Sequence, residues 1–216
     1  MGSLNLTAPL TMSSFDKNVF INCPYDDEYL PLLKSLIFTI KSCGFHPRIA
    51  LERFNSAEVR LQKIKELIEC SCYGIHDLSR IKAKNAGDYF RLNMALELGM
   101  DIGCRDYHPD PVFRQKKLLV LEHERFSVQK GLSDMSFGDC KCHEGSEEKL
   151  IKCVRDWFYE SGTKKIKPAS AIWDEFNEFM SNLYVEKTAQ GYSHEEIDHI
   201  LVPEYIDWID ERFNGK

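Results

Sequence analysis

The sequence lacks any long apolar run, and none of its segments approaches the roughly 20 residues that a membrane-spanning helix needs. The amino terminus also lacks the basic flank and apolar segment of a secretion signal. Positive charge is not in excess, because the formal net charge is -6, which argues against a broad nucleic-acid-binding face. These absences predict a cytoplasmic protein with no membrane span and no extended nucleic-acid surface.

The eight cysteines lack the spacing of a usual zinc site. Two short segments each place two cysteines near a histidine: Cys70, Cys72 and His76, then Cys140, Cys142 and His143. Neither segment has two residues between its thiols, and no second pair completes four ligands. Without a secretion signal, we expect reduced thiols and not a disulfide framework. The sequence therefore predicts neither a metal site nor a resident cofactor.

The chain does have enough apolar residues for one α/β core, since 43% of its 216 residues are hydrophobic. Four short apolar runs are typical of strands buried on both faces: 18–22, 47–51, 72–78 and 117–122. Segments with helical spacing follow them: 31–43, 59–68, 89–100 and 146–159. Asn55 and Glu58 resemble a capping box before the second helix. Residues 138–143 are predicted to form an irregular or edge segment.

This alternation predicts a three-layer α/β fold, because parallel strands need crossover connections and right-handed crossovers place helices on the sheet faces. We expect a flavodoxin-like parallel sheet flanked by helices. The predicted boundaries are an N-terminal tail over 1–16, the α/β domain over 17–165 and a helical appendage over 166–216.

The appendage carries a stripe of large apolar side chains at helical spacing: Trp173, Phe176, Phe179, Met180 and Leu183. Such stripes are usually buried. We therefore expect this one to pack against the α/β core or against a second subunit, and the protein is expected to form a homo-oligomer.

Glu97 is the candidate catalytic residue. It lies among apolar residues on a helix predicted to end near Gly99, and burying an unpaired carboxylate is costly unless it serves a site. The alternative is a structural ion pair with Arg48, Arg80 or Arg91.

Polar residues leave the predicted sheet at its carboxyl edge, where ligands bind in open α/β folds. Eight candidates for substrate binding lie in these segments or on the helix of Glu97: Asn22, Tyr25, Asp77, Ser79, Arg80, Phe90, Arg91 and Asn93. Solvated turns and helix caps remain the alternative interpretation of the turns after the strands.

The segment Glu97-Leu98-Gly99, with Gly103 and the strand 117–122 after it, resembles the nucleophile region of nucleoside 2-deoxyribosyltransferases. The turn Phe20-Ile21-Asn22-Cys23-Pro24-Tyr25 is similar to the nucleoside-contacting turn of that family. The same order of elements also resembles Toll/interleukin-1 receptor (TIR) domains, through residues 19–27, 64–71 and 73–79. The resemblance covers roughly residues 17–125.

The resemblance implies cleavage of a bond between ribose C1′ and a base, with Glu97 stabilising the oxocarbenium-like state or forming a glycosyl intermediate. Asn93 would hold a ribose hydroxyl, Tyr25 or Phe90 would stack on a base, and Asp77 would orient the ribose or carry a proton.

Two positions depart from these families. Arg91 stands where the deoxyribosyltransferases tend to carry Asp, and Asn93 stands where many bacterial TIR enzymes have Trp. Because guanidinium groups match phosphate oxygens, Arg80 and Arg91 favour a phosphorylated ligand.

The leading hypothesis is therefore an enzyme that cleaves or transfers the N-glycosidic bond of NAD or a related nucleotide, as NADases and ADP-ribosyl cyclases do. The resemblance permits a role in antiviral defence. Two alternatives stay open: a nucleoside 2-deoxyribosyltransferase or nucleoside hydrolase, and a non-catalytic module for nucleotide binding or self-assembly.

Overall fold

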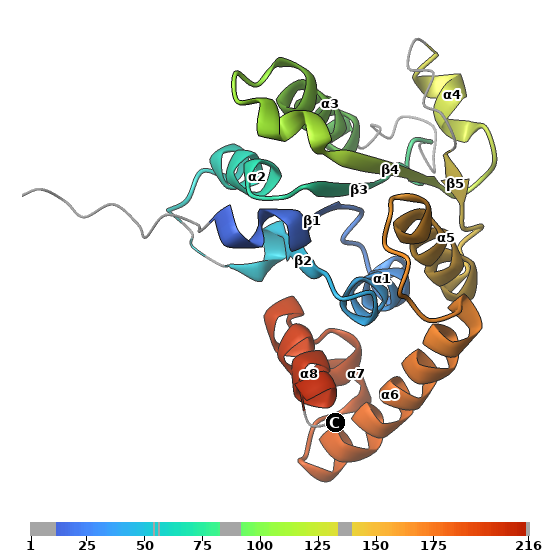
Figure 1. The fold of residues 1–216 in the computed structure, drawn as a ribbon. Coiled ribbons are helices and arrows are strands. Elements are labelled where there is room, and N and C mark those ends of the chain that lie inside the picture. The colour runs from blue at the N-terminus through green and yellow to red at the C-terminus, as the bar shows by residue number, and fades with distance from the viewer. Residues whose placement is uncertain (1–11, 54, 56, 83–91, 134–139, 215–216) are drawn as a thin grey trace, which may run out of the picture.

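A five-stranded sheet with every neighbouring pair parallel forms the centre of the molecule (Figure 1). The computed structural model describes residues 12–53, 55, 57–82, 92–133 and 140–214. The strands are β1 (Asn18–Asn22), β2 (His46–Ile49), β3 (Tyr73–Asp77), β4 (Lys117–Glu122) and β5 (Lys141–Cys142). Their spatial order is β2-β1-β3-β4-β5, which is the flavodoxin-like order. The predicted fold class is confirmed.

Helices cover both faces of the sheet (Figure 1). One face carries α1 (Leu30–Ser42) and α5 (Glu147–Glu160), and the other carries α2 (Arg60–Glu69) and α3 (Leu92–Tyr107). A short helical segment, η1 (Met12–Lys17), precedes β1, and three more lie in the connections: η2 (Ala50–Glu52), η3 (Pro111–Gln115) and α4 (Ser127–Gly131). The chain ends in α6 (Ala169–Ala189), α7 (His194–Asp198) and α8 (Val202–Asn214).

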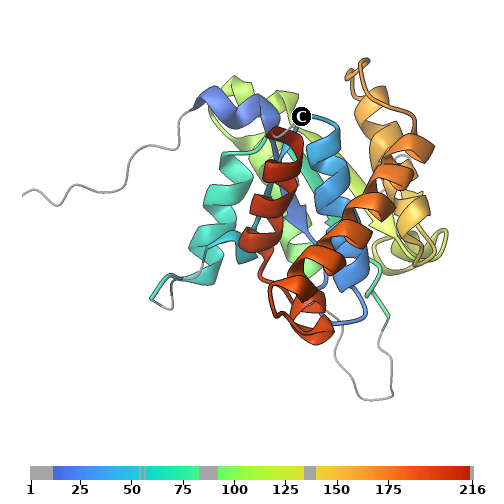
Figure 2. The ribbon, with the colours of Figure 1, turned by 90° about the horizontal axis from the view of Figure 1, so that it is seen from below.

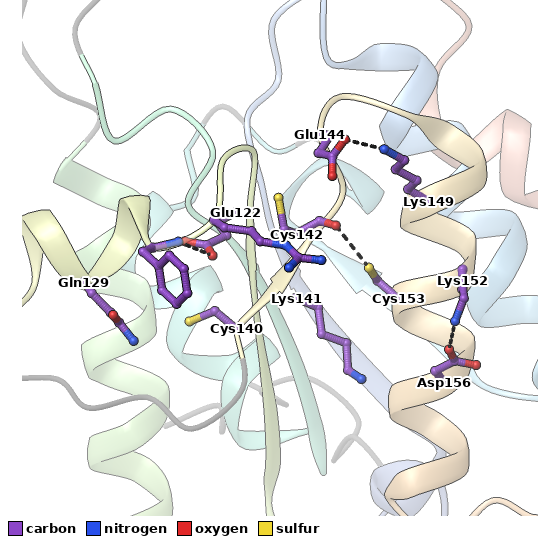
Figure 3. A pocket seen from close by; sticks show the side chains of 12 residues that line it. Glu122, Gln129, Cys140, Lys141, Cys142, Glu144, Lys149, Lys152, Cys153 and Asp156 are labelled. Carbon is purple, nitrogen blue, oxygen red and sulfur yellow. Dashed lines mark hydrogen bonds and ion pairs between the residues drawn. The ribbon is translucent and has the colours of Figure 1, made fainter.

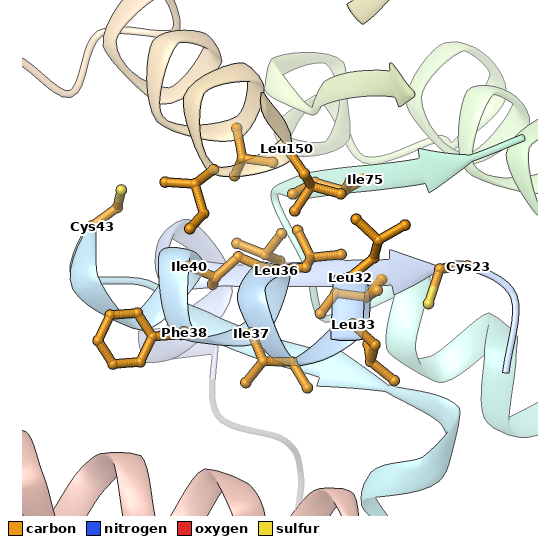
Figure 4. Close-up of a cluster of buried hydrophobic side chains, with 14 of the residues drawn as sticks. Cys23, Leu32, Leu33, Leu36, Ile37, Phe38, Ile40, Cys43, Ile75 and Leu150 are labelled. Atoms are coloured by element: carbon orange, nitrogen blue, oxygen red, sulfur yellow. The ribbon is translucent and has the colours of Figure 1, made fainter. Parts of the chain in front are cut away.

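The largest part of the core lies around α1, as Figure 4 shows. Leu36 and Ile40 of this helix are fully buried in one cluster with Ile75 of β3 and Leu150 of α5. Pro31 occupies the first turn of α1, and Gly44 follows the helix with a φ of +81°, a backbone conformation that favours glycine. The predicted start and stop of this helix are confirmed.

The C-terminal helices pack against α1 on the side away from the sheet (Figures 1 and 2). Phe38 of α1 is the centre of this contact, since its ring lies 5.5 Å from Phe176, 5.3 Å from Phe179 and 5.7 Å from Phe213 between centroids. The aromatic stripe of α6 thus packs on the α/β core, which is the first of the two arrangements expected from the sequence.

The predicted capping box before α2 is wrong. The helix begins at Arg60, and no side chain caps it. Asn55 accepts a hydrogen bond from the backbone N–H of Ala57 instead, because an Asn side chain bonds readily to its own chain two residues on. Glu58 pairs with Arg53 and Lys63.

The helix that carries Glu97 is longer than predicted. It continues through Gly99 and Gly103 to Tyr107, since a glycine inside a helix costs about 1 kcal/mol but does not end the helix by itself. Its expected start at Tyr89 lies outside the described residues. No helix in the described parts of the chain combines the length and apolar character needed to cross a membrane.

Candidate functional site

The candidate site lies at the carboxyl edge of the sheet, between β1 and β3. These two strands are neighbours, but the helices that follow them, α1 and α3, cover opposite faces (Figure 1). In parallel sheets a crevice forms where neighbouring connections diverge in this way, and ligands bind there. The turn after β1 and the first turns of α3 supply its side chains.

Glu97 is a buried carboxyl group with no partner among the described residues. Its residue exposure is only 4%, and no described side chain or backbone group forms a hydrogen bond or ion pair with it. Burial raises the pKa of Glu97 to about 7, and the charge of Arg60 opposes the rise. Of the ion-pair partners considered from the sequence, Arg48 pairs with Glu52 and Arg80 with Asp26, while Arg91 lies outside the described residues.

Two residues of the turn after β1 lie within reach of the charge of Glu97. Burial, followed by the charges of Cys23 and Glu97, raises the pKa of Tyr25 well above its usual value. Burial, followed by the charges of Asp77 and Glu97, also raises the pKa of the Cys23 thiol well above its usual value. The guanidinium of Arg60, at the start of α2, lies 5.9 Å from the centroid of the Tyr25 ring.

Within the described residues, the site therefore brings together an acid, a phenol, a thiol and the cation of Arg60. The sequence analysis missed Cys23 and Arg60. Arg60 is exposed and begins a helix, so nothing in its local pattern distinguishes it from a surface residue.

Asn22 belongs to a buried polar chain beneath α3. Its amide nitrogen donates to His76 Nδ1 at 3.0 Å and to the Met94 carbonyl at 2.8 Å. His76 Nε2 lies 3.1 Å from Asp101, whose other oxygen lies 3.1 Å from Lys116 Nζ. Asn22 therefore links the end of β1 to the first turns of α3 by hydrogen bonds, and this link fixes the position of Glu97 relative to the sheet.

Asp77 faces the opposite side of the sheet, as alternation along β3 requires. Its carboxylate accepts hydrogen bonds from the Tyr29 hydroxyl at 2.6 Å and from the Ser79 N–H at 2.8 Å. His143 Nε2 lies 3.1 Å away, and Gly145 N–H donates to the other ring nitrogen. Although burial acts to raise the pKa of Asp77, the hydrogen bond and charge of His143, together with the other donors, lower it.

The remaining predicted residues are only partly brought together. Arg80 pairs with Asp26 and Glu28, each at 2.9 Å, and its buried Nε has no hydrogen-bond partner in the part of the chain that the structure describes. Asn93 is exposed on α3, one turn before Glu97. Ser79 contributes its backbone N–H to Asp77. Two others, Phe90 and Arg91, lie outside the described residues.

The two segments that place cysteines near a histidine form contacts within the protein. His76 and His143 belong to the two polar networks above, and the Cys142 thiol donates to the His123 carbonyl at 3.1 Å. Cys140, Cys142 and Cys153 line a cavity of about 650 Å³ between β5 and α5 (Figure 3). Within the described residues, no three His, Cys, Asp or Glu side chains are grouped so that they could hold a metal ion.

The fold and this edge of the sheet define an α/β protein with a buried carboxyl group, Glu97, near the topological switch point of its sheet. The chain matches no protein-family model, no curated protein and no solved structure.

Proposed function

We propose that this protein cleaves the N-glycosidic bond of NAD or a related nucleotide, with Glu97 as the catalytic carboxylate. The observation that carries the proposal is the burial of Glu97, which is 4% exposed and whose ionised form is favoured, among the described residues, by the charge of Arg60 alone. A buried carboxylate without a partner is costly in the free protein. A substrate that places positive charge next to this carboxylate offsets the free-energy cost of burying it.

The chemistry of NAD supplies such a charge. When the bond between ribose C1′ and the pyridinium nitrogen breaks, its electron pair leaves with nicotinamide, which departs neutral, and positive charge develops on the ribose. Water then adds to C1′ and releases a proton. A carboxylate beneath C1′ stabilises the charged state, or bonds to C1′ until water displaces it.

The pKa of Glu97 fits this task. With a pKa of about 7, roughly half of the molecules are ionised at neutral pH. A cationic pyridinium or an oxocarbenium-like sugar beside the carboxyl group favours its ionised form. The substrate itself would therefore convert Glu97 into the state that the reaction uses.

The other side chains divide into two roles in this proposal. Tyr25, on which the charge of Glu97 acts, offers its ring to a base, and Asn93, exposed one turn earlier on α3, offers an amide to a ribose hydroxyl. The amide nitrogen of Asn22 and the carboxylate of Asp77 are engaged by contacts within the protein, so these residues position the turn and the helix.

The test is incubation of the protein with NAD and chromatographic measurement of free nicotinamide. The expected result is release by the native protein and a loss of at least about 100-fold in Glu97→Gln. Glu148→Gln, on the exposed side of α5, is the matched control and should retain full activity. Absence of release, or equal release by Glu97→Gln, would refute the proposal.

Product analysis separates the related reactions. Formation of ADP-ribose identifies hydrolysis, and a cyclic ADP-ribose identifies a signalling cyclase; either product would be compatible with a role in antiviral defence. Base exchange between deoxynucleosides identifies the transferase alternative. If the protein is a self-assembling module without catalysis, Glu97→Gln should leave its function intact, whereas substitutions at Trp173 or Phe176 should abolish it.

A further inference from the structure

A small apolar cavity lies next to the candidate site, at the same edge of the sheet. It has a volume of about 190 Å³. Its walls come from the end of β3, the first turns of α3 and the end of α4, and its apolar side chains are Leu78, Ile81, Leu92, Met94 and Leu132. We refer to this cavity as the slot.

The slot and Glu97 share helix α3. Met94 lines the slot and Glu97 follows three residues later, so the two side chains occupy neighbouring positions about one helical turn apart. The Met94 carbonyl is held by Asn22 at 2.8 Å, which fixes the position of this turn. A ligand at Glu97 that extends along α3 reaches the slot.

The size of the slot limits what can enter it. Pockets that hold a whole drug-sized ligand measure about 300–1,000 Å³. A cavity of about 190 Å³ therefore accommodates one ring system and not an entire nucleotide.

Arg80 gives the slot its polar edge. It lines the cavity, its terminal nitrogen is held by Asp26 and Glu28, and its buried Nε has no hydrogen-bond partner among the described residues. A planar guanidinium stacks on aromatic rings and donates to ring nitrogens, and the thioether of Met94 makes favourable contacts with aromatic rings. This combination favours a planar heteroaromatic ring over an alkyl chain.

We propose that the slot binds the second base of a dinucleotide whose scissile ribose lies at Glu97. This inference rests on the proposed cleavage at Glu97 for the position of the first half of the substrate. It makes the substrate a dinucleotide, and it explains why an apolar cavity stands beside a site for a charged, phosphorylated ligand.

Binding to the slot can be measured without turnover. Methionine methyl labelling places one reporter in the slot, Met94, and an internal reference on α6, Met180. Adenosine 5′-monophosphate should shift the Met94 signal and leave that of Met180 unchanged. Ribose 5-phosphate, which lacks the ring, should shift neither. Equal shifts at both methyl groups, no shift with the monophosphate, or the same Met94 shift with ribose 5-phosphate would overturn the proposal.

Two variants test the assignment. Ala95→Leu adds three carbon atoms to a residue that lines the slot and should weaken binding of the monophosphate at least tenfold. Leu92→Ser removes apolar surface from a residue that is 69% exposed, so it should weaken binding without threatening the fold. Ala189→Leu, exposed at the end of α6, is the matched control and should leave the affinity unchanged. Unchanged affinity in both slot variants would contradict the proposal.

The rates of cleavage of two substrates distinguish the proposal for the slot from the proposal that Glu97 is catalytic. If both hold, NAD should be cleaved at least tenfold more efficiently than nicotinamide mononucleotide, and Ala95→Leu should reduce that preference to about onefold. Cleavage of both compounds with equal efficiency would overturn the slot proposal alone. Binding of the monophosphate at Met94 without any cleavage of NAD would overturn the catalytic proposal and leave the slot as a base-binding cavity without a scissile ribose at Glu97.

Discussion

His76 Nε2 lies 3.1 Å from Asp101 Oδ2, and both side chains are fully buried. Because Asn22 donates to the other ring nitrogen, the ring proton resides on Nε2 and points at Asp101. This contact joins β3 to α3 and passes directly over Gly74 of β3. Together with Lys116, it forms a polar support beneath the helix that carries Glu97.

Replacement of Gly74 by alanine should destabilise the protein. An added Cβ would lie 2.4 Å from Asp101 Oδ2 and 2.9 Å from His76 Nε2, so the buried pair would have to separate. We expect a loss of at least about 2 kcal/mol in the free energy of unfolding, measured by urea denaturation.

Gly99→Ala in α3 is the matched control for that substitution. No heavy atom lies within 4 Å of its added Cβ, and alanine favours the helix, so this variant should gain about 0.5–1 kcal/mol. Equal effects of the two substitutions would contradict the close approach at Gly74.

Lys116→Met should be strongly destabilising, because Lys116 Nζ is buried and lies 3.1 Å from Asp101 Oδ1. It also donates to the carbonyl groups of Ile68, at 2.8 Å, and Ser71. Removing one member of a buried ion pair typically costs about 3–5 kcal/mol. Unfolding in denaturant should show this loss, and Lys116→Met combined with Asp101→Asn should lose less than Lys116→Met alone.

The exposed Lys65 of α2 provides the control for the charge removed. Lys65→Met should stay within about 0.5 kcal/mol of the native protein. If Lys116→Met also changes the free energy of unfolding by less than about 0.5 kcal/mol, the ion pair of Lys116 with Asp101 does not stabilise the packing of α3 on the sheet.

Glu97 should make stability depend on pH in the opposite sense to most carboxyl groups. Its pKa rises from an ordinary value of 4.5 to about 7 in the folded protein, so between these values the folded state keeps a proton that the unfolded chain releases. The stabilising contribution is therefore complete below pH 4.5 and is lost as the pH rises through about 7. The shift corresponds to about 3 kcal/mol.

Urea denaturation at pH 5 and pH 8 tests this dependence. Glu97→Gln removes the titrating group, so the difference in stability between native protein and variant should move in favour of the variant as the pH increases. A constant difference would show that the pKa of Glu97 is not raised. The kcat/KM for cleavage of NAD, which reports the pKa values of the free enzyme, should instead increase with pH through about 7 in the native protein, because the ionised carboxylate is the active form.

Phe179→Ala should destabilise the α/β core, although Phe179 belongs to the C-terminal helices. Its ring lies 5.3 Å from that of Phe38, and its residue exposure is 5%. Removing a buried aromatic ring costs about 3–5 kcal/mol, and the loss should appear in a single unfolding transition that includes the signal of the sheet.

Val185→Ala on the same helix is the control, since Val185 is 70% exposed. It should change stability by less than about 0.5 kcal/mol.

Sedimentation of both variants shows whether α6 also contributes to an assembly. A change of mass in Val185→Ala but not in Phe179→Ala would place an interface on the exposed face of α6.

Much of the fold could be predicted from local pattern. The strands 18–22 and 117–122 match β1 and β4 in their bounds, and Ser146 and Ser193 cap α5 and α7. These elements carry their signals in a few consecutive residues. The start of α2 could not be predicted in the same way, because Asn55 bonds to its own turn and leaves the helix uncapped.

By itself, the sequence determined the alternation of strands and helices, and with it a parallel sheet whose carboxyl edge holds the polar residues. Only the tertiary structure decided their partners. It brought His143 from the end of β5 to Asp77, tied Asn22 to His76 and buried Glu97 where its charge acts on Tyr25, with no hydrogen bond or ion pair to another described residue. The reason is physical: hydrophobic periodicity is a property of neighbouring residues, whereas the environment of a carboxyl group depends on segments that meet only when the sheet has formed.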